Sequence, residues 1–315
     1  MELSKSGKGI IMIALAGCLW GTLGSMVKIL SSYNLLSQTI VFWRVFLAFI
    51  ILYSYTYLTN KDLLKIDKQG ILYSALMGLV CQTLFNIMYF ISIQQTTIST
   101  AVVLLYTSPI FIIILSRILY NEKLTKWKII SLIICIIGCF LTVTGGNINA
   151  LKFDIWGILL GIGAGFTYSL YTIFSKHTLK KYNHLTIIVY MLGFGSLFIL
   201  FISKPSDIFL IDYDIKIFSL LFYLSILATI APYILYSAGL SYGVNPSKAG
   251  IIATVEVIVA VVISFLFFNE SILGWKLIGI VMVLFSVFII RLDDSNLKDN
   301  LNITEKKPII NQHHL

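Results

Sequence analysis

Glu256 is the acidic residue of this 315-residue sequence that lies well inside a long apolar stretch, residues 248–268. An ionised carboxylate there is costly unless it is paired or hydrated. Two functional interpretations follow: the carboxylate exchanges a proton for substrate, or it binds the amine of an amino acid or a cationic drug. The structural alternative is an ion pair, for which Arg44 and Lys248 are conceivable partners. Glu256 is therefore a candidate coupling residue.

Polar and aromatic side chains also share single faces of two other apolar stretches. Gln82, Asn86 and Tyr89 fall at i, i+4 and i+7, and Tyr233 and Tyr236 are three residues apart. Such side chains are expensive against lipid, so they should turn toward the bundle interior or a wet cavity. Interhelical hydrogen bonds and interfacial aromatic belts are the alternative. The candidate substrate-binding residues are Trp20, Gln82, Asn86, Tyr89, Tyr106, Ser108, Tyr168, Tyr233 and Tyr236.

Metal and catalytic chemistry are poorly supported by the remaining reactive residues. The four histidines, none deep in an apolar stretch or at ligand spacing, are His177, His184, His313 and His314. The four cysteines, which lie within apolar stretches and form no Cys-x-x-Cys pair, are Cys18, Cys81, Cys135 and Cys139. There is no clustered acid pair. We therefore expect no catalytic residue and no metal site.

The composition places these side chains in a membrane. Hydrophobic residues make up 58% of the chain and charged residues only 12%, whereas a soluble domain carries about 25% charged residues. A hydrocarbon core about 30 Å thick is crossed by about 20 helical residues. Ten such stretches run approximately over residues 9–30, 38–58, 71–92, 97–119, 127–145, 155–176, 185–202, 217–241, 248–268 and 275–291. The short connections leave no room for a soluble ligand-binding, nucleotide-binding or catalytic domain.

The distribution of basic residues predicts the orientation. Seventeen of the 23 Lys and Arg residues fall on the side of the N-terminus and five on the other, with Arg44 inside a stretch. By the positive-inside rule, both termini are expected in the cytoplasm. The net charge of +9 is explained by this topology and by anionic lipid, because the basic residues are dispersed over short loops. No nucleic-acid partner is expected.

An internal repeat relates the two halves of the chain. An offset of 148 residues pairs Lys28 with Lys176, Ser99 with Ser247, Asn121-Glu122 with Asn269-Glu270, and Trp127-Lys128 with Trp275-Lys276. Each copy holds five apolar stretches, an odd number, so the second copy must enter the bilayer from the opposite side. Inverted repeats of this kind characterise secondary transporters that work by alternating access.

Two prolines within apolar stretches, Pro109 and Pro232, are candidate hinges, because each removes a backbone hydrogen bond and obstructs the preceding turn. A static kink satisfied by a neighbouring helix is the alternative. The offset pairs Pro109 with Val257 and Pro232 with Leu84. The prolines therefore predict that the two halves bend in different places.

The chain resembles the drug/metabolite transporter superfamily with paired EamA-type domains over about residues 9–291. The resemblance is carried by Trp20-Gly21 followed by Lys28, Phe42-Trp43-Arg44, Tyr106-Thr107-Ser108-Pro109 and Glu122; Glu256 stands where the family often shows Glu-Pro. The resemblance implies a polytopic carrier of small metabolites, often amino acids or related compounds, frequently an exporter, with no bound cofactor. The compact form resembles bacterial members, which implies the bacterial inner membrane.

We therefore expect an all-α integral membrane protein with ten transmembrane helices in two inverted five-helix repeats, residues 9–145 and 155–291, followed by a disordered cytoplasmic tail, residues 292–315. The expected function is transport of an amino acid or related compound by alternating access, with export as the expected direction, and not catalysis. The expected partners are a small-molecule substrate, protons and membrane lipid, with the chain acting as a monomer or a homodimer. A drug, nucleobase or sugar carrier is the first alternative. A lipid scramblase, which would need a groove open to lipid, is the second.

Overall fold

The computed structural model describes residues 5–209, 215–268, 272 and 274–305. All regular structure within these residues is helical. They contain nine helical segments long and apolar enough to cross a membrane, and α10, a shorter apolar helix, supplies the tenth crossing. The expected all-helical, ten-helix membrane fold is confirmed.

The first repeat crosses the membrane five times. Its helices are α1 (Lys5–Gly21), α2 (Leu23–Ser31), α3 (Ser37–Thr59), α4 (Lys68–Met77), the π-helix η2 (Gly78–Leu84), α5 (Phe85–Gln95), α6 (Ile98–Leu105), α7 (Ser108–Tyr120) and α8 (Lys126–Thr144). The pairs α1–α2 and α6–α7 and the trio α4–η2–α5 each form one crossing. A 3₁₀ turn, η1 (Lys61–Leu64), lies between α3 and α4.

The second repeat follows a connection that contains the 3₁₀ turn η3 (Ile148–Ala150). Its helices are α9 (Ile155–Thr178), α10 (His184–Leu200), α11 (Ile215–Ser225), the π-helix η5 (Ile226–Ile230), α12 (Ala231–Ser241), α13 (Pro246–Ala253), α14 (Val255–Phe268) and α15 (Trp275–Glu305), with a 3₁₀ turn η4 (Pro205–Phe209) after α10. The helix α15 continues past residue 292, where we expected disorder to begin. Residues 306–315 of the expected tail lie outside the described residues.

Polar residues outside the apolar stretches set several helix ends. The Asp67 carboxylate accepts the Gly70 N–H (2.9 Å) at the start of α4, and the Thr125 hydroxyl accepts the Lys128 N–H (3.2 Å) at the start of α8. Asn121 ends α7 in the left-handed conformation, with φ 51°. These caps place the turns at the ends of the crossings.

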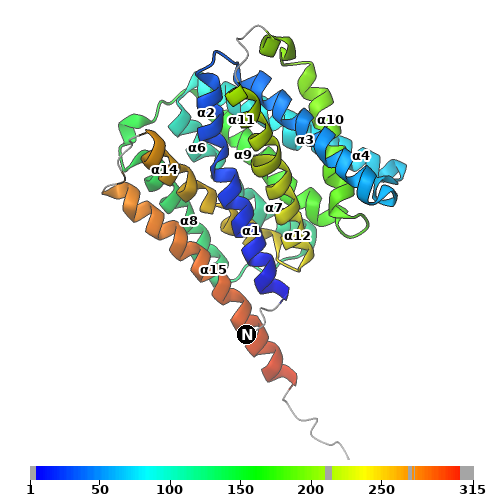
Figure 1. Ribbon diagram of the computed structural model, residues 1–315. Coiled ribbons are helices and arrows are strands. Elements are labelled where there is room, and N and C mark those ends of the chain that lie inside the picture. Colours follow the sequence, from blue (N-terminus) through cyan, green and yellow to red (C-terminus); the bar gives the residue numbers. More distant parts are fainter. Residues whose placement is uncertain (1–4, 210–214, 269–271, 273, 306–315) are drawn as a thin grey trace, which may run out of the picture.

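The start of α1 and the C-terminal part of α15 lie at the same end of the bundle (Figure 1). We call this the terminal end and the opposite one the distal end. The helices alternate in direction between these ends, so the loops around residues 59–68, 121–125, 179–183 and 242–245 lie at the terminal end. An even number of crossings between the two termini agrees with the topology expected from the charges.

The internal repeat is visible in the packing of α8 against α15, which lie side by side (Figure 1). The Ser131 hydroxyl of α8 donates a hydrogen bond to the Ser286 carbonyl of α15 (2.6 Å). The repeat partner of Ser131 is Gly279, and the repeat partner of Ser286 is Gly138. These two glycines also meet, because a Cβ on Gly279 would lie 2.7 Å from the Gly138 carbonyl oxygen. Equivalent positions of the two repeats therefore meet twice across one interface, as two related halves require.

The two halves bend in equivalent places, so the prediction from the prolines is wrong. The π-helices η2 and η5 begin at Gly78 and Ile226, which are 148 residues apart. The breaks between α6 and α7 and between α13 and α14, at Tyr106 and Thr254, have the same separation. Only one member of each pair adjoins a proline, because a π-turn or a break is also stabilised by packing and by side-chain hydrogen bonds.

Candidate substrate-binding site

Four tyrosine side chains from α9 and α12 meet around Trp20 of α1. The Trp20 ring centroid lies 6.3 Å from Tyr168, 6.4 Å from Tyr171, 5.5 Å from Tyr233 and 5.4 Å from Tyr236. We call these five residues the aromatic cluster. Most of the contacts are edge-to-face, which is favourable for aromatic pairs. Because α1 belongs to the first repeat and α9 and α12 to the second, the cluster joins the two halves.

Glycines bring the backbones of the surrounding helices close together. A Cβ on Gly17 of α1 would lie 2.7 Å from the Ala253 carbonyl oxygen, and one on Gly21 would lie 2.5 Å from the Glu256 carbonyl oxygen. Gly165, the repeat partner of Gly17, faces α6 in the same way, with a Cβ 3.3 Å from the Leu105 carbonyl oxygen. This close approach of α1 to α14 places Trp20 on the helix next to Glu256.

The Glu256 carboxylate is half-buried at the edge of the aromatic cluster. Tyr168 donates a hydrogen bond to it from a hydroxyl 3.3 Å away, and Tyr106 lies near the same carboxylate. The other titratable side chains that face it are Tyr89, Tyr236 and Cys139. None of the ion pairs within the described residues involves Glu256. Lys248, one conceivable partner, pairs instead with Asp293, so an ion pair of Glu256 with Lys248 is not formed.

The polar face expected around Gln82 reaches the aromatic cluster from the first repeat. Gln82 lies in η2 and donates a hydrogen bond to the Tyr233 hydroxyl. The Asn86 amide donates to the Gln82 carbonyl (2.5 Å), so these side chains form a continuous line. A π-turn widens the helix at this point and frees carbonyls from the regular ladder, and such turns are frequent at functional sites.

Arg44 of α3 is a buried cation near Tyr233. Its side chain is 6% exposed, its Nε atom has no hydrogen-bond partner, and it interacts electrostatically with Tyr233. No ion pair of Arg44 is present among the described residues, so Arg44, the other conceivable partner, does not pair with Glu256. A buried guanidinium with an unused donor is costly, which makes Arg44 available to an anionic group.

The remaining sequence-predicted residues lie at varying distances from the cluster. Tyr89 packs against Phe85, which in turn contacts Tyr168 (ring centroids 5.6 Å apart). Ser108 and Pro109 are buried at the start of α7, directly after the break that contains Tyr106. Pro232 is the second residue of α12, directly after η5. The structure therefore brings together the sequence-predicted residues around Glu256 and Tyr233. Ser108, Pro109 and Pro232 lie beside the helix breaks.

Tyr171 belongs to the cluster and was missed from the sequence. Its ring lies 4.8 Å from that of Tyr233, and its hydroxyl forms a hydrogen bond with the Ser237 hydroxyl (2.9 Å). Tyr171 follows Tyr168 by three residues, which is helical spacing for a shared face, so the pattern could have identified it.

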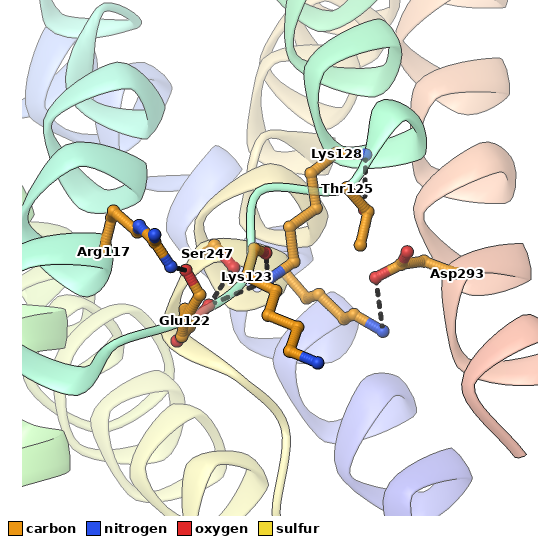
Figure 2. Close-up of polar contacts among 8 residues, drawn as sticks. Arg117, Glu122, Lys123, Thr125, Lys128, Ser247 and Asp293 are labelled. Atoms are coloured by element: carbon orange, nitrogen blue, oxygen red, sulfur yellow. Dashed lines mark hydrogen bonds and ion pairs between the residues drawn. The ribbon is translucent and has the colours of Figure 1, made fainter. Parts of the chain in front are cut away.

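A cluster of buried polar side chains lies at the terminal end of the bundle. Ser247 of α13 donates a hydrogen bond to the Glu122 carboxylate, which also accepts one from Lys128 (3.0 Å). Figure 2 shows these side chains directed toward one another from the loop after α7, from α8 and from α13. Beside them, the Lys248 ammonium lies 3.2 Å from Asp293, with both side chains 2% exposed. The contact of Ser247 with Glu122 connects the two repeats.

An apolar groove of about 400 Å³ lies between α3 and α10. Its lining is almost wholly aromatic and aliphatic, namely Phe42, Phe46, Phe49, Tyr53, Tyr190, Gly193, Phe194, Ser196, Leu197 and Leu200. It offers no charged side chain, so it suits hydrocarbon better than a polar solute or a lipid headgroup.

Comparisons with known proteins agree on one kind of protein. The model of the EamA-like transporter family matches residues 7–144 and again residues 155–292. YicL, an uncharacterized inner membrane transporter of Salmonella typhimurium, is 24% identical over 295 residues, which cover 92% of this chain and 97% of the relative. An uncharacterized transporter of Archaeoglobus fulgidus is 28% identical over 287 residues, with 89% and 95% covered.

The fold also matches a known crystal structure. The match has a TM-score of 0.75 at 13% identity and covers 90% of this chain and 96% of the other. At this identity the likeness supports the fold alone.

Proposed function

Since this chain belongs to the EamA-like transporter family, we propose that it is a secondary transporter that moves a small polar metabolite across the membrane by alternating access. An amino acid or related compound is the proposed substrate, and export is the proposed direction. The site assigned to the substrate is the aromatic cluster with Gln82, Asn86, Tyr89, Tyr106 and Ser108. The proposal includes no catalytic step and no cofactor.

The observation that carries the proposal is the contact between Ser247 and Glu122, which joins the two repeats at the terminal end. In an inverted repeat, the halves can exchange conformations, so that the end that is closed in one state opens in the other. Ser99 and Lys276 repeat Ser247 and Lys128 at the distal end; Glu270, the repeat partner of Glu122, lies outside the described residues. The repeat thus gives both ends related polar residues with which to close.

Glu256 is the residue proposed for coupling to protons. Its carboxylate faces tyrosines and a cysteine, so it can lose a proton to the substrate path without first breaking an ion pair. Pro109 and Pro232 are the proposed hinges, because each adjoins a break or a π-turn of a crossing helix. The protein is proposed to lie in the plasma membrane, which is the inner membrane of a bacterium. Both of its termini are proposed to lie in the cytoplasm.

Drugs, nucleobases and sugars are alternative substrates for the same fold. Scrambling of lipids is less well supported, because the groove between α3 and α10 is apolar, whereas a moving headgroup needs a polar path. Lipid scrambling is therefore examined only as a possible result of the transport experiment.

The test is transport by purified protein in proteoliposomes. Uptake of a labelled amino-acid panel is measured with and without a pH gradient, and with unlabelled substrate preloaded inside. Accumulation that follows the gradient supports a proton-coupled carrier, and counterflow without gradient dependence supports a facilitator or exchanger. The absence of movement for amino acids, drugs, nucleobases and sugars would overturn the proposal, and a parallel assay with fluorescent lipid would then detect scrambling.

A further inference from the structure

The apolar groove between α3 and α10 follows the internal repeat. The two helices lie side by side, on the side of the bundle away from α8 and α15 (Figure 1). The 148-residue offset pairs groove residues of α3 with groove residues of α10, namely Phe42 with Tyr190, Phe46 with Phe194 and Phe49 with Leu197. Because one helix comes from each repeat, a ligand in the groove would contact both halves.

The groove is suited to a hydrocarbon chain. Its volume of about 400 Å³ lies within the range of about 300–1,000 Å³ that holds small ligands. The lining is aromatic and aliphatic, and Leu197 and Tyr53 are both exposed, so the groove is open along the outside of two crossing helices. In a membrane, the neighbours of such a surface are the acyl chains of lipids.

A column of side chains extends the groove toward the terminal end. Phe49 and Tyr53, which line the groove, and Tyr57 stand four residues apart on α3, with ring centroids 5.7 Å and 6.3 Å apart. The Lys61 ammonium lies over the exposed Tyr57 ring, 4.3 Å from its centroid. None of the ion pairs in the described part of the chain includes Lys61. The column therefore passes from hydrocarbon through phenols to an ammonium group.

The positions that repeat this column at the other end of the groove are apolar. The repeat partners of Tyr53, Tyr57 and Lys61 are Phe201, Pro205 and Phe209. The 3₁₀ turn η4, which contains the last two, follows α10 at the distal end. The ordered series of hydrocarbon, phenol and ammonium therefore gives the groove a direction, which the repeat alone would not.

We propose that an anionic phospholipid of the surrounding membrane binds at this surface, with an acyl chain in the groove and its phosphate at Lys61. A phospholipid presents its groups in the matching order, from hydrocarbon through ester-linked glycerol to phosphate. Tyrosine rings favour the boundary between hydrocarbon and water, and a basic residue beside that boundary attracts anionic lipid. A second copy of the chain fits less well, because a twofold contact would bring both Lys61 side chains to the same end, where they repel.

The experiment compares three ligands that separate the chains from the headgroup. Dioctanoyl phosphatidylglycerol has acyl chains and an anionic headgroup, dioctanoyl phosphatidylcholine has the same chains and a zwitterionic headgroup, and glycerophosphoglycerol is the anionic headgroup alone. Native mass spectrometry of the full chain, released from neutral detergent micelles, measures their affinities and the oligomeric state. The phosphatidylglycerol should bind about fivefold more tightly than the phosphatidylcholine, the factor that one basic residue near a membrane surface supplies. Glycerophosphoglycerol should not bind.

One pair of variants tests the headgroup contact. Lys61→Gln should bind the two lipids equally, with the affinity for phosphatidylcholine unchanged. Lys204→Gln, which removes the same charge from the segment that follows α10 at the distal end, is the control and should keep the fivefold preference. A folding defect would weaken both lipids together, so the loss of preference alone separates recognition from stability.

A second pair tests the groove. Leu197→Trp fills it and should weaken both lipids by about tenfold or more, because the exclusion of two CH₂ groups already costs about that factor. Leu284→Trp is the matched control, since Leu284 of α15 is 52% exposed and Leu197 is 48% exposed, and it should bind both lipids as the wild type does. Leu200→Trp, at another groove position, serves if Leu197→Trp does not fold.

Other results would overturn the proposal. Equal binding of the two lipids by the wild type, or loss of the preference in Lys204→Gln as well as in Lys61→Gln, would show attraction to the overall charge instead of a site. Binding of glycerophosphoglycerol as tight as that of the lipid would indicate a site for a free phosphate ester. Unchanged lipid binding in both groove variants would place the chains elsewhere, and a dimer that Leu197→Trp abolishes would place a second copy in the groove.

Discussion

The Ser247 hydroxyl of α13 donates a hydrogen bond to the Glu122 carboxylate at the end of α7, and this contact joins the second repeat to the first at the terminal end. Lys128 pairs with the same carboxylate over 3.0 Å. The Glu122 side chain is 9% exposed and that of Lys128 is 4% exposed, so solvent screens the pair little. In the proposed alternating-access cycle, separation of the two repeats at this end would require that the bond between Ser247 and Glu122 break.

Ser247→Ala should therefore loosen the terminal end. A hydrogen bond to a charged group contributes about 1.5–3 kcal/mol, so opening of this end should become at least about tenfold more frequent. Hydrogen exchange measured in nanodiscs should be faster at residues 121–125 and 245–248. Ser99→Ala, at the equivalent distal position, is the control and should leave exchange at those residues unchanged. Equal effects of the two variants would show that Ser247 has no special part in the closure.

The ion pair between Lys248 and Asp293 should behave differently when one or both charges are removed. Both side chains are 2% exposed, so Lys248→Met leaves an uncompensated buried carboxylate, which costs about 3–5 kcal/mol. The double variant Lys248→Met with Asp293→Leu should recover most of that loss, because neither charge then remains. Unfolding by denaturant in detergent micelles measures both. A double variant no more stable than Lys248→Met would contradict this account.

Gly21 should not tolerate a side chain. A Cβ there would lie 2.5 Å from the Glu256 carbonyl oxygen and 2.7 Å from the Val259 Cβ, so α1 and α14 must move apart. Gly21→Ala should lose about 1–3 kcal/mol of stability, as overpacked sites do, and should weaken substrate binding at Trp20. Gly24→Ala is the matched control, because no atom lies within 4 Å of the added Cβ. The control should be as stable as the wild type or slightly more so. If Gly24→Ala lost as much stability as Gly21→Ala, the loss could not be attributed to close packing of α1 against α14.

Glu256→Gln should remove the response of transport to a pH gradient while the protein remains folded. The amide cannot exchange a proton, yet it fills the same space and can still accept a hydrogen bond from Tyr168. Uptake in proteoliposomes with and without a gradient measures the effect. Asp67→Asn, which alters a carboxylate at the start of α4, is the control and should keep the gradient response. Full pH-driven transport by Glu256→Gln would return Glu256 to a purely structural role.

The sequence allowed the crossings, the repeat and several residues of the aromatic cluster to be predicted, since these depend on local patterns. Hydropathy marks the crossings, and helical spacing placed Gln82 on the face that meets Tyr233. The partner of Lys248 was not predicted, because Asp293 lies on another helix and only tertiary packing brings them together. The bends were predicted incorrectly from Pro109 and Pro232, because packing and side-chain hydrogen bonds also shape the helices, as the bond from Thr83 to the Gly78 carbonyl illustrates.

A second tie between the repeats at the terminal end should depend on pH. Asp67 precedes α4, and its carboxylate accepts hydrogen bonds from Lys181 (2.6 Å) and Tyr182 (2.6 Å), both of the second repeat. These bonds, with that of the Gly70 N–H, hold the pKa of Asp67 well below its usual range, and the carboxylate in turn raises the pKa of Lys181. A depressed folded pKa means that this stabilisation is present above the unfolded value of about 3.9 and is lost as the pH falls through the folded value.

The raised pKa of Lys181 sets the alkaline side of the pH profile of this stabilisation. Its contribution is present below the unfolded value of about 10.4 and is lost as the pH rises through the folded value. Hydrogen exchange at residues 61–68 and 179–183 should therefore be slowest, after correction for intrinsic rates, between about pH 4 and pH 10. Asp67→Asn keeps an N-cap side chain but removes the charge, so it should flatten both sides of this profile. Because both partners are about half exposed, added salt should reduce the wild-type effect. A pH profile identical in the variant and the wild type would show that the Asp67 charge does not hold these loops together.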